Sequence, residues 1–155
     1  MRTMILSFSY QWYKPLVDGR KIYEHRKRFC NEPVTAYVYL GLPYRQLVAI
    51  IELGQKIEID KWLEIYSNDS QAIDRIKDCM TRNKVAMPIY SVQIIEPIDM
   101  RKAEEKIKGF RVPISYMFLD NRPELFEYIK SRTILKGSRI EHKFDNIKSE
   151  KICLY

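Results

Sequence analysis

Three charged residues near the N-terminus, Lys21, Glu24 and Arg26, have types and spacing that suit contact with a nucleotide. A lysine ammonium group can contact a phosphate or a base carbonyl, and an arginine guanidinium group can form a fork with a phosphate or with a carboxylate. A glutamate can accept a hydrogen bond from an exocyclic amine. On a strand, however, Glu24 and Arg26 could simply pair with each other and touch no ligand, and Lys21 could be a solvated turn residue. Both hypotheses remain open from the residues alone.

Positive charge is concentrated in two stretches of the chain. The 155 residues include 27 Lys and Arg against 20 Asp and Glu, a formal net charge of +7. Residues 20–28 and residues 130–143 each carry a net charge of +4. In the first stretch Tyr23, His25 and nearby Phe29 alternate with the cations, as on surfaces that stack on and neutralise a single nucleic-acid strand. We therefore expect single-stranded RNA or a nucleotide as the partner, although solvated surface turns would have the same composition.

Other classes of chemistry lack their sequence signatures. Cys30, Cys79 and Cys153 are widely separated with no C-x-x-C pair, and His25 has no second histidine nearby, so neither a disulfide framework nor a metal ion is expected. The absence of a Gly-rich phosphate loop, an H-E-x-x-H motif and a G-x-S-x-G motif indicates no cofactor and no common hydrolase class. No secretory signal, long apolar run or amphipathic basic helix is present, which predicts a cytoplasmic protein without membrane association.

The elements around the three charges decide whether these side chains meet. A strand over residues 4–8 and a helix over about residues 12–18 are expected to precede them. If the following segment is extended, alternation places Lys21 on one side of the chain and Glu24 and Arg26 on the other. Lys21 then shares a site with Glu24 only if the turn after the helix rotates it across.

The rest of the chain predicts an α+β fold that is mainly β. Residues 34–40 alternate as a half-buried strand, residues 46–53 are apolar on both faces and therefore central, and helical spacing begins at residue 70. Without βαβ regularity, a small curved sheet or barrel with flanking helices is favoured, as a single domain over residues 1–155 with a core of about residues 4–120. Further expected elements are an extended segment over 88–95 ended by Pro97, a short helix between Asp99 and Gly109, a helix over about 122–131 begun by an Asn121-x-x-Glu124 capping box, and closing strands in the tail of the 121–155 segment.

The residues Gly19, Lys21, Glu24 and Arg26 form the pattern G-x-K-x-x-E-x-R, and on this motif the sequence resembles the activating signal cointegrator homology (ASCH) family. One departure is Ala49, where family members often have glycine. The resemblance implies a PUA-like fold, a small β-barrel with flanking helices and a cleft beside the motif, in a family expected to bind RNA. The candidate RNA-binding residues are Arg20, Lys21, Tyr23, Glu24, His25, Arg26, Tyr39 and Arg45.

Two further functions remain open at this point. Some relatives hydrolyse modified nucleosides or cut RNA, and an enzyme of that kind would use Lys21 to activate a nucleophile and Glu24 to transfer the proton. Hydrolytic relatives have a threonine near the lysine, whereas this motif has Ile22 and Tyr23, which departs from their pattern. The third possibility is a transcription or translation adaptor that uses the exposed helix around residues 74–82.

Overall fold

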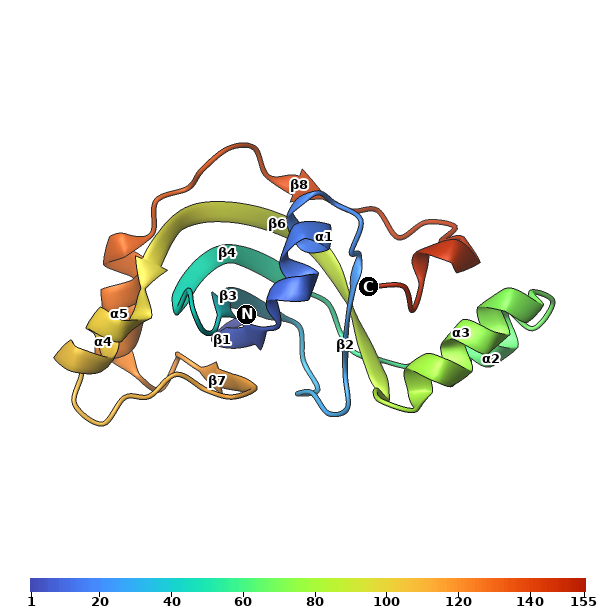
Figure 1. Cartoon of the computed structure of the whole chain (residues 1–155), viewed down its shortest axis with the longest axis horizontal. Helices are drawn as coiled ribbons and strands as arrows, with labels where there is room; N and C mark the ends of the chain where they lie inside the picture. Colours follow the sequence, from blue (N-terminus) through green and yellow to red (C-terminus); the bar gives the residue numbers. More distant parts are fainter.

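A sheet that curls into a half-barrel organises the chain (Figure 1). The computed structural model describes all residues, 1–155. The strand order is β2-β6-β4-β3-β1-β7, and β5 and β8 pair with β6 outside this path. The elements are β1 (Arg2–Phe8), η1 (Tyr10–Trp12), α1 (Tyr13–Val17), β2 (Tyr23–Arg26), β3 (Val34–Leu40), β4 (Gln46–Leu53), β5 (Ile57–Glu58), α2 (Lys61–Ile65), α3 (Ser70–Met80), β6 (Val85–Asp99), α4 (Met100–Lys106), β7 (Tyr116–Phe118), α5 (Pro123–Arg132), β8 (Ile140–Glu141) and η2 (Ser149–Lys151).

The two strands at the centre of the sheet follow the alternation of the sequence. β3 and β4 have the expected bounds, and β4 lies between β3 and β6. Antiparallel pairing sets Ala36 of β3 opposite Ile51 of β4, and β1 runs parallel to β3 on its other side. Because successive side chains point to opposite faces, Val38 packs on the face that Leu16 of α1 covers, whereas Tyr39 packs on the opposite face. The predicted strand pair and its two faces are confirmed.

Strand β6, with 15 residues, bends across the molecule and pairs with different strands along its length (Figure 1). Its first residues pair with β2 and β5, and its later residues pair with β4. The expectation that Pro97 ends this extended segment is wrong, because β6 continues to Asp99. Pro97 lies at a shift of register, between the pairs that Ile94 and Ile98 make with β4. Proline has no N–H to donate. It is tolerated there because a residue in a bulge does not need to donate a hydrogen bond to the neighbouring strand.

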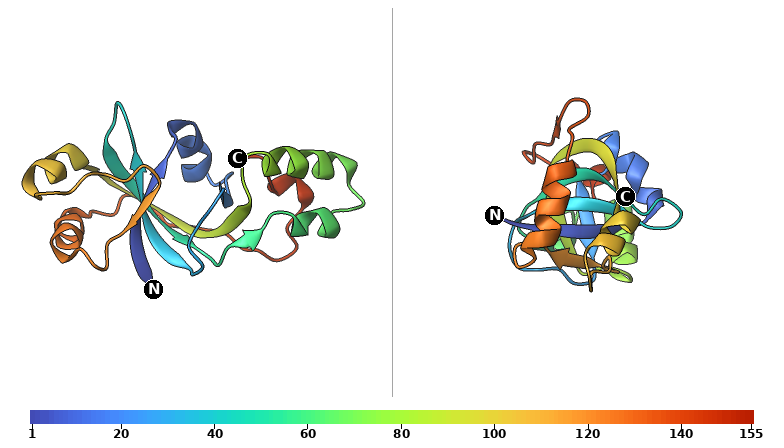
Figure 2. Two further views of the ribbon diagram at one scale, coloured as in Figure 1. Left: turned by 90° about the horizontal axis from the view of Figure 1, so that it is seen from below. Right: turned by 90° about the vertical axis from the view of Figure 1, so that its left-hand side faces the viewer.

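Helices cover the two ends of the sheet (Figure 2, left). α4 and α5 lie at one end, α2 and α3 lie with the C-terminal segment at the other, and α1 lies between them. Apolar residues of α4 and α5 pack with Tyr39, while Ile76 of α3 packs with Tyr23 of β2 and with Ile152. The amphipathic helix expected from residue 70 is confirmed as α3. No helix of the chain combines the length and the apolar character needed to cross a membrane.

Three local features differ from the sequence-based expectation. α5 begins with Pro123 in its first turn and has Arg122 at its N-cap, so no capping box with Asn121 forms; the fixed φ of proline already suits this position. α2 and β5 were not expected, because each is too short to show a periodic pattern. The tail closes the sheet only through β8 and one bridge between Ile95 and Leu135, since its remainder crosses to α3.

Candidate functional site: an ion-paired cleft beside the G-x-K-x-x-E-x-R motif

A turn after α1 brings Lys21 to the side of the chain that carries Glu24. Gly19 has a φ of +85°, in the left-handed region that favours glycine. The N–H of Lys21 then donates a hydrogen bond of 2.9 Å to the carbonyl oxygen of Pro15, which holds Lys21 outside β2. Its Nζ consequently lies 3.1 Å from Oε1 of Glu24. The rotation that the sequence required for a shared site therefore takes place.

Lys21, Glu24 and Arg26 form one buried network. Lys21 Nζ donates to the main-chain oxygens of Tyr23, at 2.8 Å, and Tyr155, at 2.9 Å, in addition to its ion pair with Glu24. The second carboxylate oxygen of Glu24 accepts from Nε of Arg26 at 2.7 Å and lies 2.6 Å from its Nη2. The Lys21 and Glu24 side chains are only 2% and 6% exposed. The carboxylate is thus shared between two cations and shielded from water.

Arg26 also connects strands that are not neighbours in the sheet. Its Nη2 donates to the main-chain oxygen of Ser7 at 2.6 Å, so a side chain on β2 is tied to β1. Its Nη1 makes no hydrogen bond within the protein. Arg26 therefore has both a structural contact and free donor capacity for a ligand.

The surroundings set the charge of two motif residues. Burial would raise the pKa of Glu24, but the charges and hydrogen bonds of Lys21 and Arg26 outweigh it and hold the pKa below its usual value. Burial, followed by the charge of Lys21, lowers the pKa of His25 to about 4. At neutral pH the carboxylate is therefore ionised and the imidazole is neutral.

A cleft in two adjoining parts runs beside this network. One part has a volume of about 290 Å³ and includes Lys21, and the other has about 370 Å³ and includes Arg26. Trp12, Glu24 and His25 line both parts, so they form the wall that the two share. The cleft is polar along the motif, and an aromatic ring lies beside the cations: Lys21 Nζ is 5.4 Å from the centre of the Trp12 ring.

Several cleft residues were not identified from the sequence. Trp12 lies at the end of η1, Ser9 precedes that turn, and Cys79 and Arg82 come from the C-terminal end of α3 and the residues after it. The C-terminal segment 153–155 completes the wall. Local patterns carry no signal for these residues, because tertiary packing alone brings them to the motif.

Four of the predicted RNA-binding residues lie elsewhere. Tyr23 is buried against Trp62, and Tyr39 is buried in the core cluster beneath α4 and α5, so neither lines the cleft. The expectation that Tyr39 contacts RNA beside the motif is therefore corrected. β3 alternates as expected, but the face of β3 that carries Tyr39 points away from the motif. Arg45 lies in the turn between β3 and β4, outside the cleft. Arg20 is at the surface, paired with Asp18 at 2.9 Å.

The cations of the second basic stretch do not line the cleft, and those on α5 lie far from it. None of its cations lines either part of the cleft, and Arg132 instead lines a separate hollow beside α4 and α5. Lys130 and Arg132 belong to α5, at the end of the molecule opposite α3 (Figure 2, left). The cations on α5 therefore do not extend the charged surface around the motif.

The geometry also bears on the hydrolase hypothesis. All three hydrogens of the Lys21 ammonium group have acceptors, and none of these acceptors is a hydroxyl group. Ser7 and Ser9 contribute to the other part of the cleft, where the Ser7 hydroxyl donates to the carbonyl oxygen of Pro113 at 2.6 Å. The cleft thus contains no hydroxyl nucleophile bonded to Lys21, as activation by this lysine would require.

Comparison with known proteins identifies the fold. No family model matches the sequence, and no curated protein matches it. Among solved structures, the ASCH protein from Zymomonas mobilis superposes with a TM-score of 0.63 at 20% identity, covering 86% of this chain and 96% of that one. A serine-to-alanine variant of the same protein gives a TM-score of 0.64 at 19% identity, covering 86% of this chain and 97% of that one. A half-barrel with flanking helices, matched over most of both chains, is the fold of the ASCH domain, and this protein has that fold.

Proposed function

We propose that this protein binds single-stranded RNA and holds one nucleotide in the cleft beside Lys21, Glu24 and Arg26. The observation that carries the proposal is the assembly of these three charges, through the turn at Gly19, into one network on the wall of a cleft. A buried network of this kind holds its groups in fixed positions, which favours recognition of a polar ligand. The compartment that we propose is the cytoplasm.

The cleft offers each contact that a nucleotide needs. Its two parts, about 290 and 370 Å³, suit a ligand of nucleotide size. The free Nη1 of Arg26 can donate to a phosphate, and the face of Trp12 can stack on a base. Sequence-specific proteins commonly bind RNA as unpaired bases stacked on aromatic rings, which supports a single strand as the partner.

Cations outside the cleft would extend the contact along the RNA backbone. Lys27 and Arg28 are exposed and follow Arg26 directly at the end of β2, and neither forms an ion pair. Arg20 is 47% exposed at the other side of the motif, where its guanidinium lies over the ring of Tyr155. These residues would neutralise phosphates without reading the sequence.

The proposal is tested with fluorescently labelled single-stranded RNA and fluorescence anisotropy. We expect salt-sensitive binding that Trp12→Leu weakens by roughly 5- to 150-fold, corresponding to about 1–3 kcal/mol per stacked base. Tyr128→Leu is the matched control, because Tyr128 is a partly exposed aromatic residue on α5, away from the cleft. Its affinity should equal that of the wild type, and circular dichroism should show both variants folded.

Absence of salt-sensitive binding by the wild type, after removal of co-purified nucleic acid, would overturn the proposal. Equal loss of binding in the Trp12 and Tyr128 variants would also contradict it, since the cleft would then have no special role. Mass spectrometry of the same samples separates recognition from hydrolysis. An RNA or modified nucleoside converted to a new product by the wild type would favour the enzyme hypothesis instead.

A further inference from the structure

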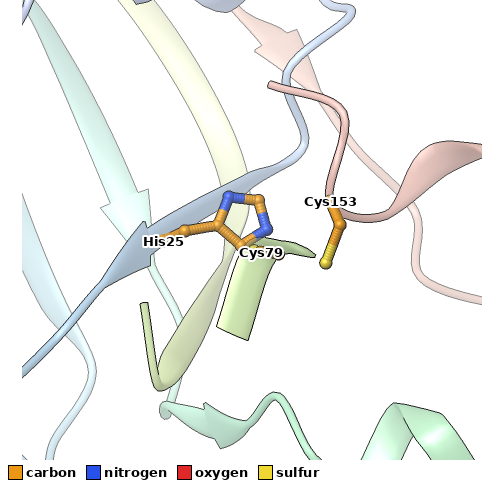
Figure 3. Close-up of side chains that lie close together, drawn as sticks. All are labelled: His25, Cys79 and Cys153. Atoms are coloured by element: carbon orange, nitrogen blue, oxygen red, sulfur yellow. The ribbon is translucent and has the colours of Figure 1, made fainter. Parts of the chain in front are cut away.

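Two cysteines and a histidine from three distant parts of the chain lie close together (Figure 3). His25 lies on β2, Cys79 lies in the last turn of α3, and Cys153 lies in the C-terminal segment. Their ligand atoms, one nitrogen and two sulfurs, all lie within 4.8 Å of one another. All three residues line the part of the cleft that contains Lys21 and Glu24. The third thiol of the chain, Cys30, belongs to another region and hydrogen-bonds to the carbonyl oxygen of Glu32.

The imidazole of His25 is oriented as in metal-binding sites. Its Nδ1 lies 3.0 Å from the main-chain oxygen of Tyr155, which can only accept a hydrogen bond. The hydrogen of the neutral ring therefore belongs on Nδ1, and Nε2 has a free lone pair. Nε2 is buried and has no hydrogen-bond partner. Histidine ligands characteristically donate one ring N–H to a carbonyl oxygen while the other nitrogen binds the metal.

The segment that carries Cys153 is held in place by packing and hydrogen bonds. Arg75 of α3 donates to the main-chain oxygen of Ser149 at 2.7 Å, and the Tyr66 hydroxyl donates to that of Ile147 at 2.8 Å. The side chain of Ile152 is fully buried against α3. Cys153 itself has a φ of +56°, a conformation that costs energy for a residue with a side chain. Its Sγ is thus positioned near Cys79 by contacts made elsewhere in the tail.

We propose that His25 Nε2, Cys79 Sγ and Cys153 Sγ bind a Zn²⁺ ion, with a fourth coordination position open to the cleft. Zinc prefers this combination of imidazole and thiolate ligands, and tetrahedral bond lengths of about 2.0–2.3 Å place such ligand atoms about 3.6–3.8 Å apart. The separations in the protein, at most 4.8 Å, need only small side-chain rotations to reach these values. The open position faces the space lined by Lys21 and Glu24, where water or a ligand atom would complete the coordination.

A disulfide between Cys79 and Cys153 is the competing explanation for the paired thiols. It would use both sulfurs and leave Nε2 of His25 buried without a partner, which is rare for a polar atom in a folded protein. A metal ion satisfies all three atoms at once. This proposal departs from the sequence-based expectation of no metal ion. Metal motifs are recognised by short spacings, whereas these ligands lie 54 and 74 residues apart along the chain.

The test is metal binding by the reduced, full-length chain without RNA, so its outcome is independent of the proposed function. The protein is treated with a chelator and a phosphine reductant, and ZnCl₂ is titrated against a chromogenic chelator. We expect one Zn²⁺ per chain, and Co²⁺ in its place should give the visible absorption of a tetrahedral thiolate site. Loss of a residue that only hydrogen-bonds to a metal ligand typically weakens metal binding by roughly 10–100-fold. We expect a larger loss when a ligand itself is removed, in Cys79→Ser, Cys153→Ser and His25→Ala. Cys30→Ser is the matched control and should bind as the wild type does.

A second measurement on the wild type covers the case in which ligand variants fail to fold. Zn²⁺ should protect Cys79 and Cys153 from alkylation by iodoacetamide, read by peptide mass spectrometry, and should leave the reaction of Cys30 unchanged. Equal protection of all three cysteines, or none, would overturn the proposal. So would Zn²⁺ binding that survives in folded ligand variants, or a Cys79–Cys153 disulfide that persists in reductant and prevents zinc uptake.

Discussion

Glu24 is the residue on which the motif depends, because it holds two cations in a nearly dry environment. Both of its oxygens are engaged, one with Lys21 and one with Arg26. The sequence left open whether Glu24 and Arg26 pair with each other or contact a ligand, and the structure shows the pair. Lys21 belongs to the same network, so changing it disturbs the fold as well as the cleft. Substitution of Lys21 is consequently a poor way to separate binding from stability.

Replacing Glu24 should therefore have a large effect on stability. Glu24→Gln keeps the shape but leaves the buried Lys21 and the partly buried Arg26 without their anion, and breaking a buried pair in this way costs about 3–5 kcal/mol of unfolding free energy. Urea denaturation followed by circular dichroism measures the change. Glu127→Gln is the matched control, because Glu127 is 74% exposed in a surface pair with Lys130 and should lose no more than about 1 kcal/mol. Equal losses in the two variants would contradict the importance of the buried network.

At the scale of elements, α3 and the C-terminal segment are joined through one side chain. Asp69 at the N-cap of α3 accepts a hydrogen bond from the N–H of Ala72 at 3.1 Å, and its other oxygen accepts one from the Ser149 hydroxyl. The same carboxylate thus caps the helix and fixes the tail that carries Cys153. The hydrogen bond from Ser149, followed by that from Ala72, lowers the pKa of Asp69.

This shift of Asp69 predicts a dependence of stability on pH. A carboxyl group whose pKa is lower in the folded state stabilises the fold above its unfolded pKa, about 3.9, and loses that contribution as pH falls through the folded pKa. Unfolding free energies of the wild type and Asp69→Ala should therefore differ at pH 7 and converge as pH falls below about 4. Asp74→Ala on the exposed face of α3 is the control, since its carboxylate makes no hydrogen bond or ion pair. If the unfolding free energies of the wild type and Asp69→Ala differ by the same amount at pH 7 and below about pH 4, the predicted linkage is disproved.

At the scale of the whole molecule, two groups of exposed cations, one after β2 and one on α5, lie far apart. Lys27 and Arg28 follow β2 at the cleft, while Lys130 and Arg132 lie on α5 at the other end (Figure 2, left). In the complex that we propose, an RNA strand held in the cleft would lie next to the first group. Net charge alone could not distinguish these regions, because it records how many cations there are and not where the fold places them.

The salt dependence of RNA binding should reveal this division. Each phosphate neutralised on a single strand contributes about 0.7 to the slope of log K against log salt concentration. The double variant Lys27→Ala/Arg28→Ala should therefore reduce the slope by roughly 1.4, if each residue meets one phosphate. Lys130→Ala/Arg132→Ala removes the same charge from α5 and should leave the slope unchanged. A reduced slope for Lys130→Ala/Arg132→Ala, with an unchanged slope for Lys27→Ala/Arg28→Ala, would place the RNA on α5 and away from the motif.

Local patterns in the sequence were sufficient for the elements that repeat with a fixed period. The alternation of β3 and the apolar run of β4 predicted the observed bounds, and the helical spacing from residue 70 predicted the start of α3, because secondary structure makes side-chain direction periodic. The G-x-K-x-x-E-x-R pattern likewise indicated the ASCH fold and the shared face of Glu24 and Arg26.

Only the tertiary structure decided what surrounds the motif. The turn at Gly19 determined that Lys21 joins Glu24, and the packing of α4 and α5 determined that Tyr39 belongs to the core and not to the cleft. The docking of the tail against α3 brought Cys153 to Cys79 and His25. Such contacts join residues far apart in the chain, and they depend on how whole elements pack against one another. A pattern of neighbouring residues carries no record of that packing.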